Sequence, residues 1–129
     1  MSRRAAAVAL ALLAPPVLAG CAGGSVVAPP AGPPATELRI GLLDYRFQLS
    51  AATLAPGSVT VVATNAGGTA HDAVFAQAGH TLGGSRVLAP GESQTFSITV
   101  AAGSPVHVEC TLPGHDAAGM HATLSVARP

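Results

Sequence analysis

Gly, Pro, Asn and Ser recur at short intervals along this chain from Glu37 onward. The runs between them are rich in Val, Ile, Leu and Thr, with partial alternation of apolar and polar positions. Such spacing is typical of short β-strands joined by turns. We therefore expect residues 37–129 to form an all-β domain.

Eight short strands are predicted in this region, and seven or eight strands in about ninety residues indicate a single β-sandwich. They cover residues 37–43, 46–50, 58–65, 71–76, 84–88, 93–100, 105–110 and 121–127. With three Phe and no Trp, the core is expected to be mainly aliphatic, which suffices for a domain of this size. The expected core residues are Ile40, Leu42, Phe47, Val59, Val61, Phe75, Phe96, Ile98, Val108, Leu124 and Val126.

A thiol, an imidazole and a thioether occur within the eleven residues from Cys110 to Met120, with His115 between them. The alternation of the strand before Cys110 points its sulfur toward the interior. A blue-copper electron-transfer site combines one thiolate, two imidazoles and a weak axial thioether. The segment therefore supplies three of these four ligands.

A second imidazole is available at His71, which follows the turn-forming segment Asn65-Ala-Gly-Gly-Thr-Ala and opens a short apolar run. With these four side chains, the chain resembles the cupredoxins, the type 1 copper proteins that include plastocyanin, azurin and auracyanin. The resemblance covers nearly all of residues 37–129. It implies a Greek-key β-sandwich of seven to eight strands that holds one type 1 copper ion through His71, Cys110, His115 and Met120.

The resemblance also implies individual roles near the metal. In cupredoxins, the His that matches His115 is the exposed ligand through which electrons leave. Asp72 stands where the family commonly carries a polar residue, and we expect it to hydrogen-bond the ligand loop and to help fix the geometry.

The remaining histidines have other expected roles. His80 lies in a Gly-rich loop and His107 faces away from Cys110 in its strand, so both are expected to be solvated. His121 directly follows Met120. It remains an alternative axial ligand, because imidazole suits copper better than a thioether does.

The neighbours of Cys110 argue against an enzyme. Multicopper oxidases and copper nitrite reductases place a His beside the matching Cys, whereas Glu109 and Thr111 flank it here. Binuclear centres of the oxidase type need two Cys in the ligand loop, which has one. The sequence also lacks a Ser-His-Asp arrangement and paired carboxylates that would indicate a reaction on a substrate.

The first twenty residues carry Arg3 and Arg4 before an Ala, Leu and Val run, which predicts a signal peptide at 1–20. The run is too short to span a bilayer comfortably. Leu18-Ala19-Gly20 before Cys21 resembles the lipobox of bacterial lipoproteins, in which the Cys is lipidated and becomes the mature N-terminus. A plain signal peptide cleaved near an Ala-x-Ala-like site and a transmembrane anchor are the alternatives.

Residues 21–36 contain four Pro among Ala, Gly and Ser, which predicts an extended tether after the lipidated Cys21. Residues 37–129 would form the cupredoxin domain. If Cys21 carries lipid, Cys110 has no partner for a disulfide. An unpaired thiol in an exported protein calls for an explanation, and metal coordination supplies one.

The charge of the mature protein excludes nucleic acid as a partner. The chain has no Lys, and two of its six Arg lie in the signal peptide, which leaves four Arg against six Asp and Glu. The absence of a basic cluster removes the electrostatic basis for binding nucleic acid.

The resemblance implies a mononuclear copper protein that shuttles single electrons between membrane-associated or extracytoplasmic redox partners. We expect a monomer that docks transiently and is held by lipid to a bacterial membrane, on its periplasmic or cell-surface side. One alternative is a copper chaperone or buffer that delivers copper to an oxidase. A second is a β-sandwich binding module without metal.

Overall fold

The computed structural model of the protein describes residues 29 and 31–129. The predicted signal peptide, Cys21 and most of the predicted tether lie outside the described residues. Among the residues that are described, none belongs to a helix long and apolar enough to cross a membrane.

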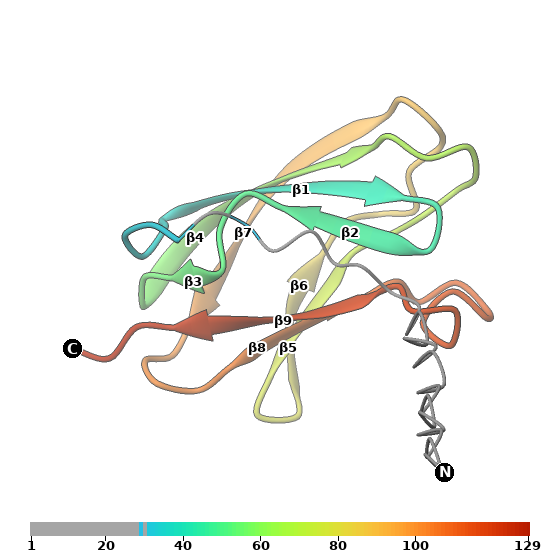
Figure 1. Cartoon of the computed structure of the whole chain (residues 1–129). Coiled ribbons are helices and arrows are strands. Elements are labelled where there is room, and N and C mark those ends of the chain that lie inside the picture. Colours follow the sequence, from blue (N-terminus) through green and yellow to red (C-terminus); the bar gives the residue numbers. More distant parts are fainter. Residues whose placement is uncertain (1–28, 30) are drawn as a thin grey trace, which may run out of the picture.

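Nine strands in two sheets make up the described part of the chain, which confirms the expected all-β sandwich (Figure 1). One sheet has the strand order β2-β1-β4-β7, and the other has the order β3-β9-β8-β5-β6. The strands are β1 (Glu37–Leu43), β2 (Arg46–Leu49), β3 (Thr53–Leu54), β4 (Gly57–Asn65), β5 (Val74–Gln77), β6 (His80–Gly84), β7 (Ser93–Val100), β8 (Val106–Glu109) and β9 (His121–Val126).

The core forms because alternate residues of each strand face the opposite sheet. In β4, Val59, Val61 and Ala63 are fully buried, while the residues between them are partly exposed. Full burial of a Val side chain contributes about 1.5–3 kcal/mol. All the expected core residues are buried except Phe96, which is partly buried and packs its ring 6.0 Å from the ring of Phe75.

The prediction of a strand at residues 84–88 is wrong. The strand in this region is β6, which pairs with β5 and ends at Gly84, where the predicted strand begins. Ala78 and Gly79 have φ of 49° and 80° and form a two-residue turn between β5 and β6. Positive φ at both central residues is what a tight hairpin turn of this kind requires. The prediction overlooked the turn because Ala rarely adopts a positive φ.

Two smaller differences also concern strand boundaries. β3 was not predicted, and its two residues pair in parallel with β9. His71 was expected to open a strand, but β5 begins at Val74. His71 instead forms an isolated bridge with Leu88, with N···O distances of 3.1 and 2.7 Å.

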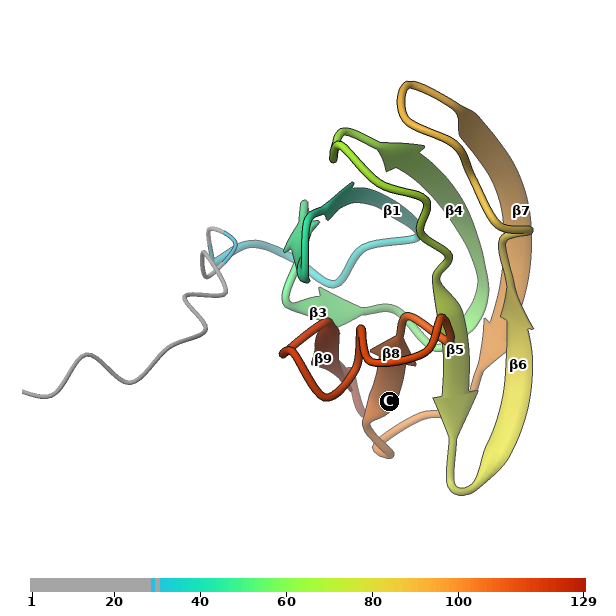
Figure 2. The ribbon, with the colours of Figure 1, turned by 90° about the vertical axis from the view of Figure 1, so that its right-hand side faces the viewer.

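Several chain segments meet at one end of the sandwich. The β1–β2 turn and the β8–β9 loop lie at this end, where β4 also finishes and β5 begins (Figure 1). Figure 2 views the molecule with the β8–β9 loop in front. Side chains from turns that are distant in sequence can therefore meet there.

Candidate metal centre

The β8–β9 loop is folded by its own backbone hydrogen bonds into a compact wrap. Cys110 N donates to Met120 O at 3.0 Å, and Met120 N donates to His115 O at 3.1 Å. His115 N in turn donates to Leu112 O at 3.1 Å. These bonds return His115 and Met120 to the end of β8, where Cys110 lies.

Two glycines allow the loop to turn this tightly. Gly114 and Gly119 have φ of 82° and 107°, a region that side chains other than Gly rarely adopt. Each directly precedes a proposed ligand, His115 or Met120. A side chain at either glycine would strain the backbone that positions the ligand beside it.

His71 is positioned by a turn built around the buried side chain of Asn65. The Asn65 amide donates to the carbonyl oxygens of Thr69 and Leu88, both at 2.8 Å. Its Oδ1 accepts from Gly67 N at 2.9 Å. Asn65 thus ties the end of β4 to the segment before His71 and to Leu88, the bridge partner of His71.

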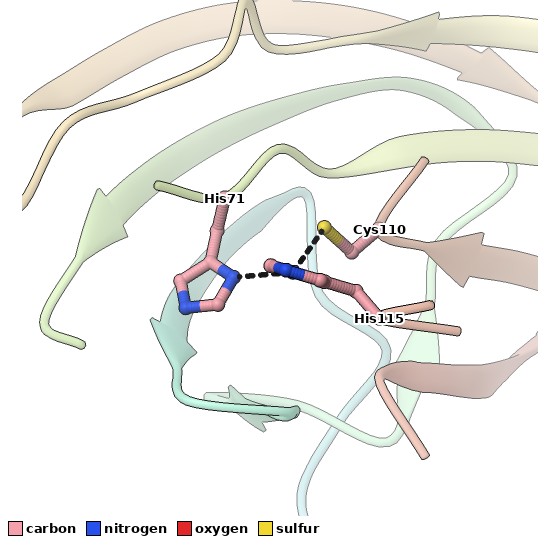
Figure 3. Close-up of side chains that lie close together, drawn as sticks. All are labelled: His71, Cys110 and His115. Atoms are coloured by element: carbon pink, nitrogen blue, oxygen red, sulfur yellow. Dashed lines mark hydrogen bonds between the residues drawn. The ribbon is translucent and has the colours of Figure 1, made fainter. Parts of the chain in front are cut away.

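His71, Cys110 and His115 point toward one another in the space between these two loops (Figure 3). His71 Nδ1 lies 3.1 Å from His115 Nδ1, and Cys110 Sγ lies 3.4 Å from the same His115 nitrogen. The three ligand atoms all lie within 4.8 Å of one another. His71 and Cys110 are 0% and 1% exposed, while His115 is partly exposed.

Met120 completes the group of predicted site residues that the structure brings together. Its side chain is fully buried, and its main chain is bonded to both Cys110 and His115. Soft sulfur ligands and imidazoles are the donors that copper prefers. The chemistry of the donor set therefore fits one type 1 copper ion.

Burial raises the pKa of the Cys110 thiol, and the nearby Asp72 carboxylate adds to this rise. Backbone hydrogen bonds at Asp72 and Leu112 lower the pKa and oppose it in part. Without a metal, Cys110 therefore holds its proton at neutral pH. Since a metal takes the thiolate, binding releases that proton.

Asp72 bonds to the ligand loop, as expected. Its carboxylate accepts from Thr111 N at 2.6 Å and also from the Thr111 hydroxyl. Asp72 directly follows His71 and Thr111 directly follows Cys110. This carboxylate therefore joins the two segments that carry the ligands.

Asp44, in the turn between β1 and β2, is a site residue that the sequence analysis missed. Its Oδ1 lies 3.0 Å from His71 Nε2, and its two oxygens each accept from Gly68 N at 3.0 Å. The hydrogen bond with His71, followed by that with Gly68 N, lowers the pKa of Asp44 to about 2. Asp44 and His71 are 27 residues apart, so no local spacing pointed to their contact.

Tyr45 is the second residue that was missed. Its ring packs edge-on against both imidazoles, with ring centres 5.2 Å from His115 and 6.4 Å from His71. Its φ of 62° is unusual for a residue other than Gly. Tyr45 is 46% exposed and covers the two histidines on one side.

The other histidines lie away from this centre. His80 and His107 are exposed, as expected. His121 is also exposed, and its Nδ1 lies 2.7 Å from Asp116 Oδ1. With Met120 buried and His121 facing solvent, the arrangement favours Met120 as the fourth ligand.

Solved structures with the same fold are found among blue copper proteins. Reduced auracyanin from Roseiflexus castenholzii is 21% identical, with a TM-score of 0.67 over 73% of this chain and 98% of that chain. An azurin from Methylomonas sp. strain J is 14% identical, with a TM-score of 0.61 over 71% and 98%. Auracyanin A, a "blue" copper protein from Chloroflexus aurantiacus, is 17% identical, with a TM-score of 0.58 over 70% and 97%.

The protein thus has the cupredoxin fold. No family model matches the sequence, and no curated protein does. Its candidate site combines the ligands His71, Cys110, His115 and Met120, with the Asp44-Tyr45 turn beside the two histidines.

Proposed function

We propose that the protein binds one copper ion through His71, Cys110 and His115, with Met120 as a weak axial ligand, and carries single electrons. The observation that supports this most directly is the convergence of one sulfur and two imidazole nitrogens within 4.8 Å. A bound copper ion would supply the change between two oxidation states that lets the protein accept and release one electron.

The side chains around the site suit an electron carrier. His71 and Cys110 are buried, so water is kept from one side of the site. His115 is partly exposed, which gives a partner protein close access to one ligand. The backbone hydrogen bonds of the β8–β9 loop hold Cys110, His115 and Met120 in place. These ligands therefore need to move little when the charge of a bound copper ion changes.

A carrier is better supported than an enzyme. A multicopper oxidase is also similar in structure, with a TM-score of 0.50 over 72% of this chain and 43% of that chain. The His that such oxidases place beside the matching Cys is replaced here by Glu109 and Thr111. Without this His, the chain lacks the covalent path from Cys110 to a second copper.

The chaperone alternative is less well supported. Copper chaperones and buffers usually expose Met and His side chains from which the metal can leave. In this chain Cys110 and Met120 are buried and joined by a backbone hydrogen bond. Burial of both sulfur atoms favours retention of the metal.

The proposal includes the place where the protein works. The lipobox-like residues before Cys21 and the Pro-rich segment after it support an extracytoplasmic carrier held to a bacterial membrane by lipid. Its redox partners would dock transiently, as is usual for electron-transfer contacts, which are small.

The test is the visible spectrum of the copper-loaded protein and of Cys110→Ser. We expect an intense blue or green colour that a reductant bleaches reversibly, because charge transfer between thiolate and oxidised copper gives the band. The serine variant should lose this band, since an oxygen ligand cannot replace the sulfur. A serine variant that keeps the colour, or a colourless wild type with copper bound, would overturn the proposal.

A further inference from the structure

A carboxylate contacts the far side of the most deeply buried imidazole of the site. His71 has one ring nitrogen, Nδ1, facing His115 and Cys110, and the other, Nε2, facing Asp44 Oδ1 at 3.0 Å. The His71 side chain is fully buried, while that of Asp44 is 46% exposed. Asp44 therefore reaches from the surface to a nitrogen that solvent does not contact.

The carboxylate of Asp44 accepts hydrogen bonds from the groups around it. Gly68 N donates to both of its oxygens, and Thr69 donates to Oδ1 through its N at 3.2 Å and its hydroxyl at 3.1 Å. Because Oδ1, the oxygen that faces His71, accepts from Gly68 N and from both Thr69 donors, it has no hydrogen to give. Its bond with His71 therefore requires the hydrogen on Nε2.

The backbone beside this pair has no room for a side chain. A Cβ at Gly67 would lie 2.7 Å from Asp44 Oδ1 and 3.0 Å from His71 Nε2. Real Cβ atoms essentially never approach other atoms below 3.0 Å. Gly67 thus lets the backbone close over the contact between Asp44 and His71.

We propose that Asp44 is a positioning residue that holds His71 in the tautomer with hydrogen on Nε2 and so leaves Nδ1 free to bind the metal. This rests on the proposed function for the identity of the metal. Carboxylates that bond to the outer nitrogen of a ligating His fix its tautomer and ring orientation and raise its basicity. Through Asp44, the β1–β2 turn would thus set which ring nitrogen of His71 is available to the metal.

The first experiment uses the metal-free protein and needs no copper. Long-range proton–nitrogen NMR of ¹⁵N-labelled histidine identifies which ring nitrogen of His71 carries the hydrogen. We expect Nε2 in the wild type, a loss of this preference in Asp44→Ala, and its retention in Asp44→Asn, whose side-chain oxygen can still accept. Hydrogen on Nδ1 in the wild type, or an unchanged preference in Asp44→Ala, would overturn the proposal.

Thr69 is the competing acceptor, because its Oγ1 lies 3.2 Å from His71 Nε2. Thr69→Val removes this oxygen and leaves Asp44 in place. We expect Thr69→Val to keep the hydrogen on Nε2. If it loses the preference while Asp44→Ala keeps it, the hydroxyl and not the carboxylate holds the tautomer.

The second experiment measures copper(I) affinity by competition with a coloured chelator. Removing the partner of a ligating His typically weakens metal binding about 10- to 100-fold, so we expect a loss of this size for Asp44→Ala. Asp44→Asn should lose less. Glu37→Gln, which removes a carboxylate at the opposite end of β1, is the matched control and should bind as the wild type does.

The outcomes separate this inference from the proposed function. If the wild type is blue and Asp44→Ala changes neither the tautomer nor the affinity, Asp44 has no positioning role and the copper assignment stands. If the wild type binds no copper, the proposed function fails, and the NMR result still decides what holds the His71 ring. Circular dichroism verifies that each variant is folded, and Asp44→Asn provides the comparison if Asp44→Ala unfolds.

Discussion

Met120 is the proposed ligand whose role is set most directly by its immediate neighbours. Its side chain is fully buried, and its backbone forms hydrogen bonds with Cys110 and His115. The adjacent His121 faces solvent and pairs with Asp116. The axial bond in blue-copper sites is weak and long. Met120 should therefore tune the copper and contribute little to holding it.

We predict that Met120→Leu keeps copper and colour and raises the reduction potential. An apolar side chain in place of an electron-donating sulfur disfavours the more highly charged oxidised metal. Met120→Gln should lower the potential, because a harder oxygen ligand favours oxidised copper. Voltammetry of the three copper-loaded proteins under one set of conditions measures both shifts.

His121→Gln serves as the control at the neighbouring position, and its potential should stay close to that of the wild type. If the potential responds to His121→Gln while the two Met120 variants leave it unchanged, the axial ligand is His121. The solvent-facing side chain of His121 argues against that result.

At the scale of elements, the β8–β9 loop is tied to the segment before β5 by one buried carboxylate. Asp72 accepts from both the backbone and the hydroxyl of Thr111. Since Asp72 follows His71 and Thr111 follows Cys110, this contact connects the two ligand-bearing segments directly.

We predict that Asp72→Ala lowers the free energy of unfolding by about 1–3 kcal/mol, because the Thr111 donors lose their acceptor. Urea unfolding of the metal-free protein measures the change. Asp116→Ala is the control, since it removes an exposed carboxylate of the same loop whose partner in the described part of the chain is the exposed His121. Its cost should be about 0–1 kcal/mol. Equal losses in the two variants would contradict a specific role for Asp72.

At the scale of the whole molecule, the metal site and the expected anchor are separated along the chain. The described domain carries all the candidate ligands, whereas Cys21 lies outside the described residues. A lipid on Cys21 would hold the domain at the membrane through the Pro-rich segment without involving the site.

We predict that Cys21→Ala releases the protein from membranes into the soluble fraction. Leu18-Ala19-Gly20 before Cys21 resembles a lipobox, so the lipid is expected on the Cys21 sulfur and cannot attach to Ala. Fractionation of cells that produce each form measures the distribution. Cys110→Ser is the matched control, because it removes the other Cys and should stay with the membrane. A wild type found wholly in the soluble fraction would leave an ordinary secreted carrier.

The sequence by itself determined the fold class and the kinds of ligand. Alternation along β1, β4 and β7 is a local property, so it predicted these strands almost to the residue. Three of the four ligands lie in one loop, where spacing alone brings them near each other. Failures were also local in origin: the turn at Ala78 has an unusual backbone for its residue type, and β3 is too short to carry a pattern.

The tertiary structure decided which distant residues meet at the site. His71 reaches His115 across 44 residues, and Asp44 reaches His71 across 27. The antiparallel pairing of β5 with β8 sets the first contact, and the parallel pairing of β1 with β4 sets the second. Side-chain contacts of this kind depend on strand register and loop path, which local residue preferences do not specify. The candidate ligands could therefore be found from the sequence, while Asp44 and Tyr45, which hold and cover them, required the folded chain.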